Sequence, residues 1–226
     1  MNRHLMIALA IAAGAVLVTS TVTVSMAQSG ESVAQSVGKS RKFMDYKDGV
    51  FRVMVGAGGP TAPLTKFFPQ VANIKAGESV VWYNPSNVPE PHTVTFVTND
   101  AQWADFVAPF VVDNSTGIVP LVPGSNAEAV TFTGPADQPV IIAANARSFN
   151  PAIVAEDGSA EYLQPNANYT MSGTEQYVNS GFIWPEGMTP QGLAEIDTFA
   201  VKFNEAGTYD YICALHPWMT GRVVVS

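Results

Sequence analysis

The sequence predicts an all-β protein, built as a Greek-key β-sandwich. Short runs with alternating or β-branched residues are separated by Gly, Pro, Asn and Asp, which is typical of strands and turns. No long stretch has the period of an amphipathic helix. The 226 residues are 47% hydrophobic, enough to bury a core, and suit one domain with an embellishment or two small domains. We expect strands at residues 50–55, 79–84, 92–97, 128–133, 140–143, 198–203, 208–213 and 222–225.

The N-terminal residues predict export. Residues 5–27 carry no charge, follow Arg3 and end in a Ser-Met-Ala triplet that suits cleavage by a signal peptidase. The same 23 uncharged residues are also long enough to stay as a membrane anchor. We therefore assign residues 1–27 as a signal peptide or membrane anchor, residues 28–48 as a flexible tether, and residues 49–226 as the folded domain. The expected location is periplasmic, extracellular or pseudoperiplasmic, and membrane-anchored if the segment is retained.

The charge of the chain is acidic and uneven. The formal net charge is −8 at pH 7, and removal of residues 1–27 would take away only Arg3 and leave −9. We therefore do not expect nucleic acid as a partner, because phosphate binding needs a basic surface. Residues 100–180 hold nine acidic residues and one basic residue. This acidic segment could dock a partner, pack on the sandwich or add solubility, and it contains glycosylation sequons at Asn114 and Asn168.

Near the C-terminus, Cys213, His216 and Met219 lie at positions i, i+3 and i+6. A thiolate, an imidazole and a thioether are donors that suit a copper ion which changes its oxidation state. The trigonal form of such a site needs a second histidine. His92 is the remaining candidate, because His4 lies in the export segment. The alternative for the lone cysteine is a buried structural thiol, since free cysteines are often buried.

Period-two alternation orients the donors toward the core. His92 and Phe96 share one face of their expected strand, and Tyr211 and Cys213 share one face of theirs. Both donors thus point inward among apolar side chains. A histidine and a cysteine that are 121 positions apart can then meet at one pole of a sandwich.

Three segments of the chain resemble the cupredoxins, and most closely the plastocyanin, amicyanin and halocyanin-like branch of that family. They are residues 75–84, 91–96 and 207–221, and the last contains the short Cys-x-x-His-Pro-x-Met spacing typical of amicyanins. The resemblance covers roughly residues 49–98 and 181–226.

The resemblance implies a cupredoxin-like sandwich with one type 1 copper ion. By position, four residues would be its ligands, three equatorial and the last one weak and axial: His92, Cys213, His216 and Met219. In this family an Asn commonly follows the first histidine and ties the two ligand loops together, whereas this chain has Thr93. The acidic segment at about residues 100–180 becomes a long insertion between the first histidine and the cysteine loop.

These features predict an extracytoplasmic carrier that moves single electrons between redox proteins, among them membrane respiratory complexes or copper oxidoreductases. Multicopper oxidases and copper nitrite reductases need further histidine-rich metal sites, and a binuclear copper domain needs two cysteines, so we do not expect an enzyme. Copper storage or delivery is the alternative function. In the family the edge of the second histidine is the electron port, and here Pro217 and Trp218 would form its docking rim, unless Trp218 is a core aromatic.

Overall fold

The computed structural model describes residues 49–98, 110–113, 117–120, 128–132 and 142–226. The expected signal peptide or anchor, the expected tether and the sequon at Asn114 lie outside these residues. Within the described ranges, no helix is long and apolar enough to cross a membrane. Strands dominate, and α3 (Ala146–Phe149) is one short turn of helix, so the all-β prediction is confirmed.

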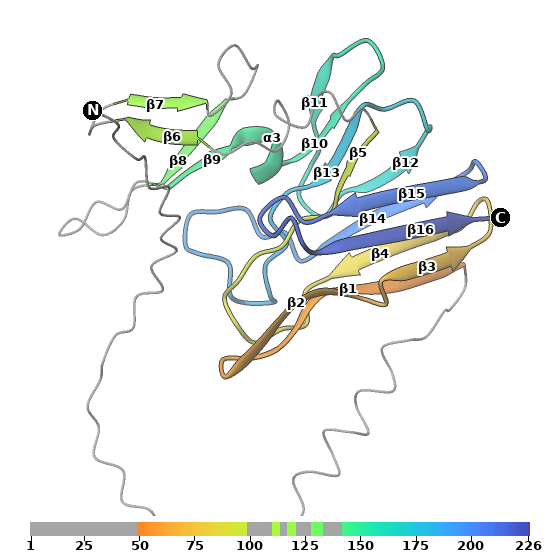
Figure 1. Ribbon diagram of the computed structural model, residues 1–226, viewed down its shortest axis with the longest axis horizontal. Coiled ribbons are helices and arrows are strands. Elements are labelled where there is room, and N and C mark those ends of the chain that lie inside the picture. The colour runs from red at the N-terminus through yellow and green to blue at the C-terminus, as the bar shows by residue number, and fades with distance from the viewer. Residues whose placement is uncertain (1–48, 99–109, 114–116, 121–127, 133–141) are drawn as a thin grey trace, which may run out of the picture. The chain divides into compact units, whose positions relative to one another are not determined.

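Two sheets make up the sandwich (Figure 1). The five-stranded sheet has the order β12 (Asn168–Met171), β14 (Thr198–Phe203), β4 (Ser79–Tyr83), β1 (Val50–Gly59) and β2 (Ala62–Phe68). The seven-stranded sheet has the order β11 (Ala160–Tyr162), β10 (Pro151–Val154), β13 (Tyr177–Ser180), β5 (Thr95–Val97), β15 (Gly207–Ile212), β16 (Thr220–Val225) and β3 (Val71–Ile74). Separate hairpins pair β6 (Phe110–Asp113) with β7 (Gly117–Pro120) and β8 (Ala129–Phe132) with β9 (Ile142–Asn145). Consecutive strands cross repeatedly between the two large sheets, as in Greek-key sandwiches.

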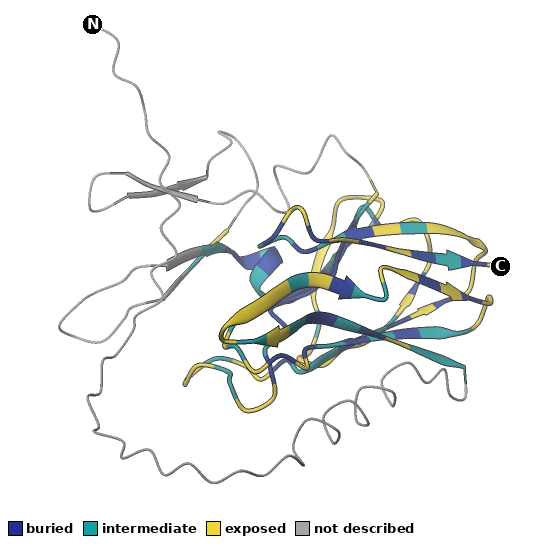
Figure 2. Ribbon diagram, turned by 60° about the horizontal axis from the view of Figure 1, so that its bottom comes forward, coloured by how far each residue is buried: buried dark blue, intermediate teal, exposed yellow. Residues whose placement is uncertain are grey.

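Alternation along the strands builds the core between the sheets. β4, β14 and β16 each bury every second residue, and Figure 2 shows the buried positions in dark blue. Aromatic rings from both sheets meet in the centre, where Trp82 packs edge-on against Phe96 and Tyr211 at centroid distances of 5.9 and 5.3 Å. This dense packing fixes the strands that lead to the candidate ligands.

The described C-terminal part of the acidic segment belongs to the sandwich. β13 pairs with both β5 and β10, and β11 extends the same sheet at its edge. β12 pairs in parallel with β14 of the other sheet. Of the roles that the sequence left open for this segment, packing on the sandwich is therefore one that residues 151–180 fulfil.

The strand boundaries differ from expectation at His92. β5 begins at Thr95 rather than at residue 92, and His92 forms an isolated bridge to Ile183 instead. Sequence alternation also missed β2 and β3. β2 contains a proline and exposes four of its seven residues, and β3 has only four residues, so neither carries a strong period-two signal.

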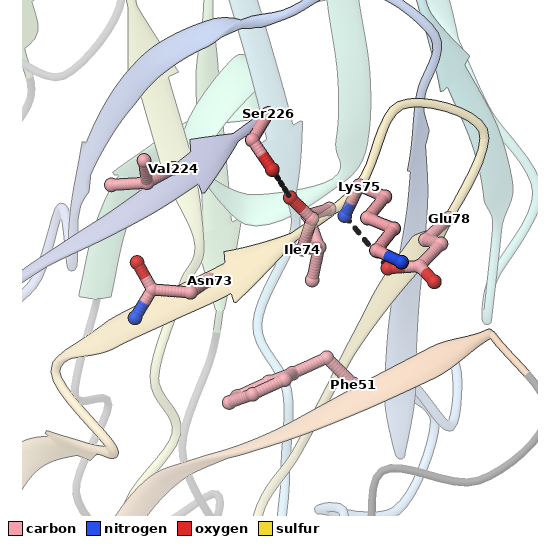
Figure 3. Close-up of a pocket in the computed structure, with 7 residues that line it drawn as sticks. All are labelled: Phe51, Asn73, Ile74, Lys75, Glu78, Val224 and Ser226. Atoms are coloured by element: carbon pink, nitrogen blue, oxygen red, sulfur yellow. Dashed lines mark hydrogen bonds between the residues drawn. The ribbon is translucent and has the colours of Figure 1, made fainter.

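An apolar hollow of about 490 Å³ lies where β3 and β16 end and β1 and β4 begin. Seven residues line it: Phe51, Asn73, Ile74, Lys75, Glu78, Val224 and Ser226. Two of the hydrogen bonds among these residues are drawn in Figure 3: the Lys75 N–H donates to Glu78 Oε2 at 2.7 Å, and Ser226 Oγ donates to the Ile74 carbonyl at 3.4 Å. The candidate ligands lie at the opposite ends of β4 and β16, so this hollow is separate from them.

Candidate metal centre

Three of the four predicted ligand residues meet at one pole of the sandwich. The Nδ1 atoms of His92 and His216 are 3.2 Å apart, and Cys213 Sγ lies 3.9 and 3.5 Å from them, respectively. All three are buried, with exposed fractions of 2% for His92, 6% for His216 and 0% for Cys213. In the described part of the chain they form a compact group of potential metal ligands.

This donor triangle has the size that a trigonal metal site requires. Imidazole nitrogens and thiolate sulfurs bind first-row metals at about 2.0–2.3 Å, so three of them in a plane around one ion lie about 3.5 Å apart. The observed separations are 3.2, 3.5 and 3.9 Å. Two imidazoles and one thiolate are also the donor set of type 1 copper sites, so the triangle is compatible with such a site.

Distant parts of the chain hold the segment around His92. Its backbone exchanges two hydrogen bonds with Ile183, at 3.1 and 2.8 Å. Its ring lies so close to Gly56 of β1 that a Cβ atom at Gly56 would be 2.6 Å from Nε2. Gly56 also has a φ of +86°, which other residues adopt only with strain. The glycine thus allows the ring to sit against β1 with Nδ1 toward Cys213.

Cys213, His216 and Met219 lie in a loop that closes on itself. The Cys213 N–H donates to the Met219 carbonyl at 3.0 Å, and the Met219 N–H donates to the His216 carbonyl at 2.8 Å. The His216 N–H donates to the Cys213 carbonyl at 3.1 Å. β15 and β16 are paired on either side of this turn, and Met219 is 1% exposed. The turn itself therefore sets the spacing of the candidate ligands.

Thr93 ties this loop to the segment around His92. The Thr93 N–H donates to Cys213 Sγ at 3.3 Å, and Thr93 Oγ1 accepts a hydrogen bond from the Ala214 N–H at 2.7 Å. A donor at the sulfur favours the thiolate form. The hydroxyl therefore joins the two ligand segments, the task that an Asn commonly has in the family which the sequence resembles.

Burial disfavours charge on His92 and on Cys213. Desolvation, reinforced by the neighbouring His216, lowers the pKa of His92 to about 4. Burial raises the pKa of the Cys213 thiol, against the opposing effect of the hydrogen bonds that it accepts. His92 is therefore neutral at pH 7, as a metal ligand must be, whereas Cys213 needs a bound cation to lose its proton.

His216 differs from His92 in what it meets beyond the triangle. Its Nε2–H donates to Glu90 Oε1 at 2.9 Å. Burial lowers the pKa of His216, and the Glu90 carboxylate opposes that shift. A proton held on Nε2 leaves the lone pair of Nδ1 for a metal, so Glu90 selects the tautomer that can bind.

Pro217 and Trp218 lie at the surface beside His216. Trp218 is 69% exposed, so it is not a core aromatic, and its ring stands edge-on to the His216 ring at 5.3 Å. Its Nε1–H donates to the Thr65 hydroxyl of β2 at 3.1 Å, which fixes the ring. Pro217 is also exposed. The two residues form an apolar edge over His216.

Sequence reasoning did not find Gly56 or Glu90. Glu90 lies only two residues before His92, but a nearby carboxylate does not show which atom it will meet. Gly56 begins a glycine-rich run, and glycine within a strand often marks a close approach by another group. That signal was present in the sequence, without an indication of the group that approaches.

Comparison of the sequence with known proteins finds relatives that are amicyanins. No family model matches the chain. Amicyanin from Paracoccus versutus is 29% identical over 85 residues, which cover 33% of this chain and 64% of that protein. Amicyanin-alpha from Methylorubrum extorquens is 68% identical over 33 residues, which cover 15% of this chain and 28% of that protein. The chain therefore spans less than two thirds of the length of these relatives.

Solved structures also align with this chain, among them the following two. A Cu(I) form of an amicyanin mutant aligns at 16% identity with a TM-score of 0.35, over 80% of this chain and 87% of that one. A purple cupredoxin from Nitrosopumilus maritimus aligns at 16% identity with a TM-score of 0.30, over 77% of this chain and 98% of that one.

The sandwich, the ligand spacing and the sequence relatives agree on one class, and the chain is similar to the cupredoxins. Within that class, the similarity is to the amicyanins of two Paracoccus species. The family resemblance seen in the sequence is therefore confirmed, as is copper as the cofactor that such a site takes.

Proposed function

We propose that this chain is a single-electron carrier with one type 1 copper ion. The observation that carries the proposal is the buried triangle of two imidazole Nδ1 atoms and one cysteine sulfur. His92, Cys213 and His216 would hold the ion in a plane, and Met219 would be the weak axial ligand. When bound, copper supplies a centre that accepts and releases one electron in a geometry suited to both oxidation states.

The task of the protein is to keep these donors in place during both states. The bridge to Ile183 and the contact with Gly56 fix His92, and the backbone hydrogen bonds of the loop fix Cys213. Donors that are packed at ligand distance before binding need little rearrangement when the charge of the centre changes. Small rearrangement is what rapid electron transfer requires.

Electrons would enter and leave near His216, where Pro217 and Trp218 present their apolar edge. Exposed aromatic residues of this kind are enriched where proteins dock. We propose redox proteins as partners, among them membrane respiratory complexes or copper oxidoreductases, and a location outside the cytoplasm in keeping with the expected export segment. The acidic charge of residues 100–180 would add long-range attraction for a basic partner.

Copper storage or delivery fits the geometry less well. Delivery requires an ion that a partner can reach and remove by exchange of ligands, but the three donors are at most 6% exposed. An enzyme would need a free position for a substrate beside the ion. The buried Met219 would occupy the fourth position here.

The visible absorption spectrum of the copper-loaded full-length protein tests the proposal. One equivalent of copper should give an intense thiolate-to-copper charge-transfer band, and Cys213→Ser should abolish it while the metal-free variant still folds. A coloured Cys213→Ser protein would contradict the ligand assignment. Fast electron self-exchange would distinguish a carrier from a storage protein, which has no need of rapid redox cycling.

A further inference from the structure

A buried chain of hydrogen bonds leads away from the metal-binding loop. The Ala214 N–H donates to Thr93 Oγ1, and the hydroxyl oxygens of Thr93 and Thr95 are 2.8 Å apart. Thr95 Oγ1 in turn donates to Asn179 Oδ1 at 2.8 Å. Thr93, Thr95 and Asn179 are each 0% exposed. Solvent therefore does not compete for these groups, and the orientation of each one depends on the next.

Asn179 sets the direction of this chain from its far end. Its Nδ2 atom lies 2.9, 3.0 and 3.0 Å from three backbone carbonyl oxygens in and beside α3, those of Arg147, Ser148 and Asn150. Carbonyl oxygens accept hydrogen bonds and cannot donate them, so the amide nitrogen faces α3 and the amide oxygen faces Thr95. Thr95 then donates to Asn179, which leaves Thr93 to donate to Thr95.

We propose that Thr95 and Asn179 are positioning residues of the metal centre. They hold the Thr93 hydroxyl in the orientation that accepts the Ala214 N–H, and so fix the turn that places Cys213 Sγ. The consequence for copper rests on the proposed function, whereas the positioning itself does not. The long segment between the ligand regions thereby supports the donors through α3 and β13, in addition to supplying strands.

Loss of one hydroxyl should disturb every hydrogen bond in this buried series, from Asn179 to Ala214. Without the Thr95 hydroxyl, the Thr93 proton loses its acceptor and Asn179 Oδ1 loses its donor. A buried network that is only partly satisfied rearranges or opens. The Thr93 proton can then turn toward Cys213 Sγ, where it competes with the Thr93 N–H, or toward Ala214, where it repels the N–H that the hydroxyl oxygen accepts. The Ala214 turn therefore loosens, although Thr95 touches none of the candidate ligands through its side chain.

The experiment compares Thr95→Val, which keeps the shape and removes the hydroxyl, with Thr95→Ser, which keeps the hydroxyl. In the metal-free full-length protein, amide hydrogen exchange at Ala214 should become about tenfold faster in Thr95→Val and stay within about twofold in Thr95→Ser. In the copper-loaded protein, release of copper to a chelator should become about threefold faster in Thr95→Val only.

Two controls separate positioning from general destabilisation. Thr98→Val removes a hydroxyl that donates to the Glu175 carbonyl at 2.6 Å. This hydrogen bond is not part of the Thr93–Thr95–Asn179 series, so the variant should leave Ala214 exchange unchanged. Exchange in the β4–β14 ladder should be the same in all variants. If Thr95→Val does not fold, Thr95→Ala repeats the test without a methyl group against the Asn179 oxygen.

Unchanged Ala214 exchange in the variants that lack the hydroxyl would overturn the inference, as would equal effects of Thr95→Val and Thr95→Ser. Because exchange is measured without copper, such a result leaves the proposed electron-transfer function untouched. Conversely, a missing charge-transfer band would refute that function and leave the exchange result standing.

Discussion

The two segments that supply the donors are held in different ways. Contacts from elsewhere in the chain fix His92, through the bridge to Ile183 and the packing of its ring on Gly56. The loop from Cys213 to Met219 is held by hydrogen bonds within itself and by the Thr93 hydroxyl, and its outer edge carries the exposed Trp218. The difference indicates that the two segments have separate tasks: the first would give a rigid position for the proposed metal, and the second reaches the surface.

The largest expected effect distinguishes the two histidines in the metal-free protein. The pKa of His92 is about 4 in the folded chain against an ordinary 6.5, so only the unfolded chain binds a proton between these pH values. The free energy of unfolding should therefore fall by about 3 kcal/mol from pH 6.5 to pH 4 through this group, and no further below pH 4. Denaturant titrations at a series of pH values measure this slope.

Variants of each histidine sharpen the test. His92→Gln should remove most of the slope between pH 6.5 and pH 4. His216→Gln should remove less, because Glu90 partly offsets the effect of burial on the pKa of His216. Equal slopes in wild type and in His92→Gln would show that His92 titrates alike in the folded and unfolded chains.

The next largest effect is expected on copper affinity, from the contact between the His92 ring and Gly56. Gly56→Ala and Gly77→Ala both place a side chain at a positive φ, +86° and +88°, which costs about 1–2 kcal/mol in each. Only at Gly56 does the new Cβ atom meet His92, since nothing lies within 4 Å of that position at Gly77. Copper affinity should fall by about 10- to 100-fold in Gly56→Ala alone, as measured by competition with a chelator. A similar loss in Gly77→Ala would attribute the effect to backbone strain.

Met219 tests the loop from Cys213 to Met219. An axial thioether is a weak ligand that changes the relative stability of the two oxidation states, and a tenfold change in that ratio corresponds to about 59 mV. Met219→Gln should lower the reduction potential and Met219→Leu should raise it, with copper retained in both, as redox titration would measure. Loss of copper from both variants would instead make Met219 a principal ligand or a requirement for folding.

The smallest effect is expected at the apolar edge that Pro217 and Trp218 form over His216. Trp218→Ala should slow electron self-exchange roughly fivefold, about 1 kcal/mol, with the absorption spectrum unchanged. Tyr162→Ala is the matched control, because Tyr162 is also an exposed aromatic whose hydroxyl donates to a side chain, that of Glu128. Tyr162 lies on β11, in the acidic segment. A slower rate in Tyr162→Ala and not in Trp218→Ala would move the docking surface to that segment.

The candidate ligands could be predicted from the sequence because of their side-chain chemistry. The residues that position them could not, because they meet only through contacts between strands that are distant in the sequence. Cys213 and the two histidines are rare residues whose side chains have few other uses in such a pattern, and alternation predicted inward faces for His92 and Cys213. Thr95 and Asn179 are 84 positions apart, and only the register of β5 against β13 brings them together. Thr95 and Phe96 point to opposite faces of β5 and are 0% and 2% exposed, so both faces are covered there. Sequence alternation cannot show a cover that comes from a distant strand.

The position of β5 between β13 and β15 has a consequence for biogenesis. Neither neighbour is near β5 in the chain, so the sheet around it closes only after long loops have been brought together, which is slow. His92 and Cys213 are 121 positions apart and approach each other only through that closure. With the proposed ligands, capture of the metal by all three donors would therefore follow assembly of the sheet. Copper bound in this way would stabilise only chains that have completed the sheet, so metal content would report completed folding.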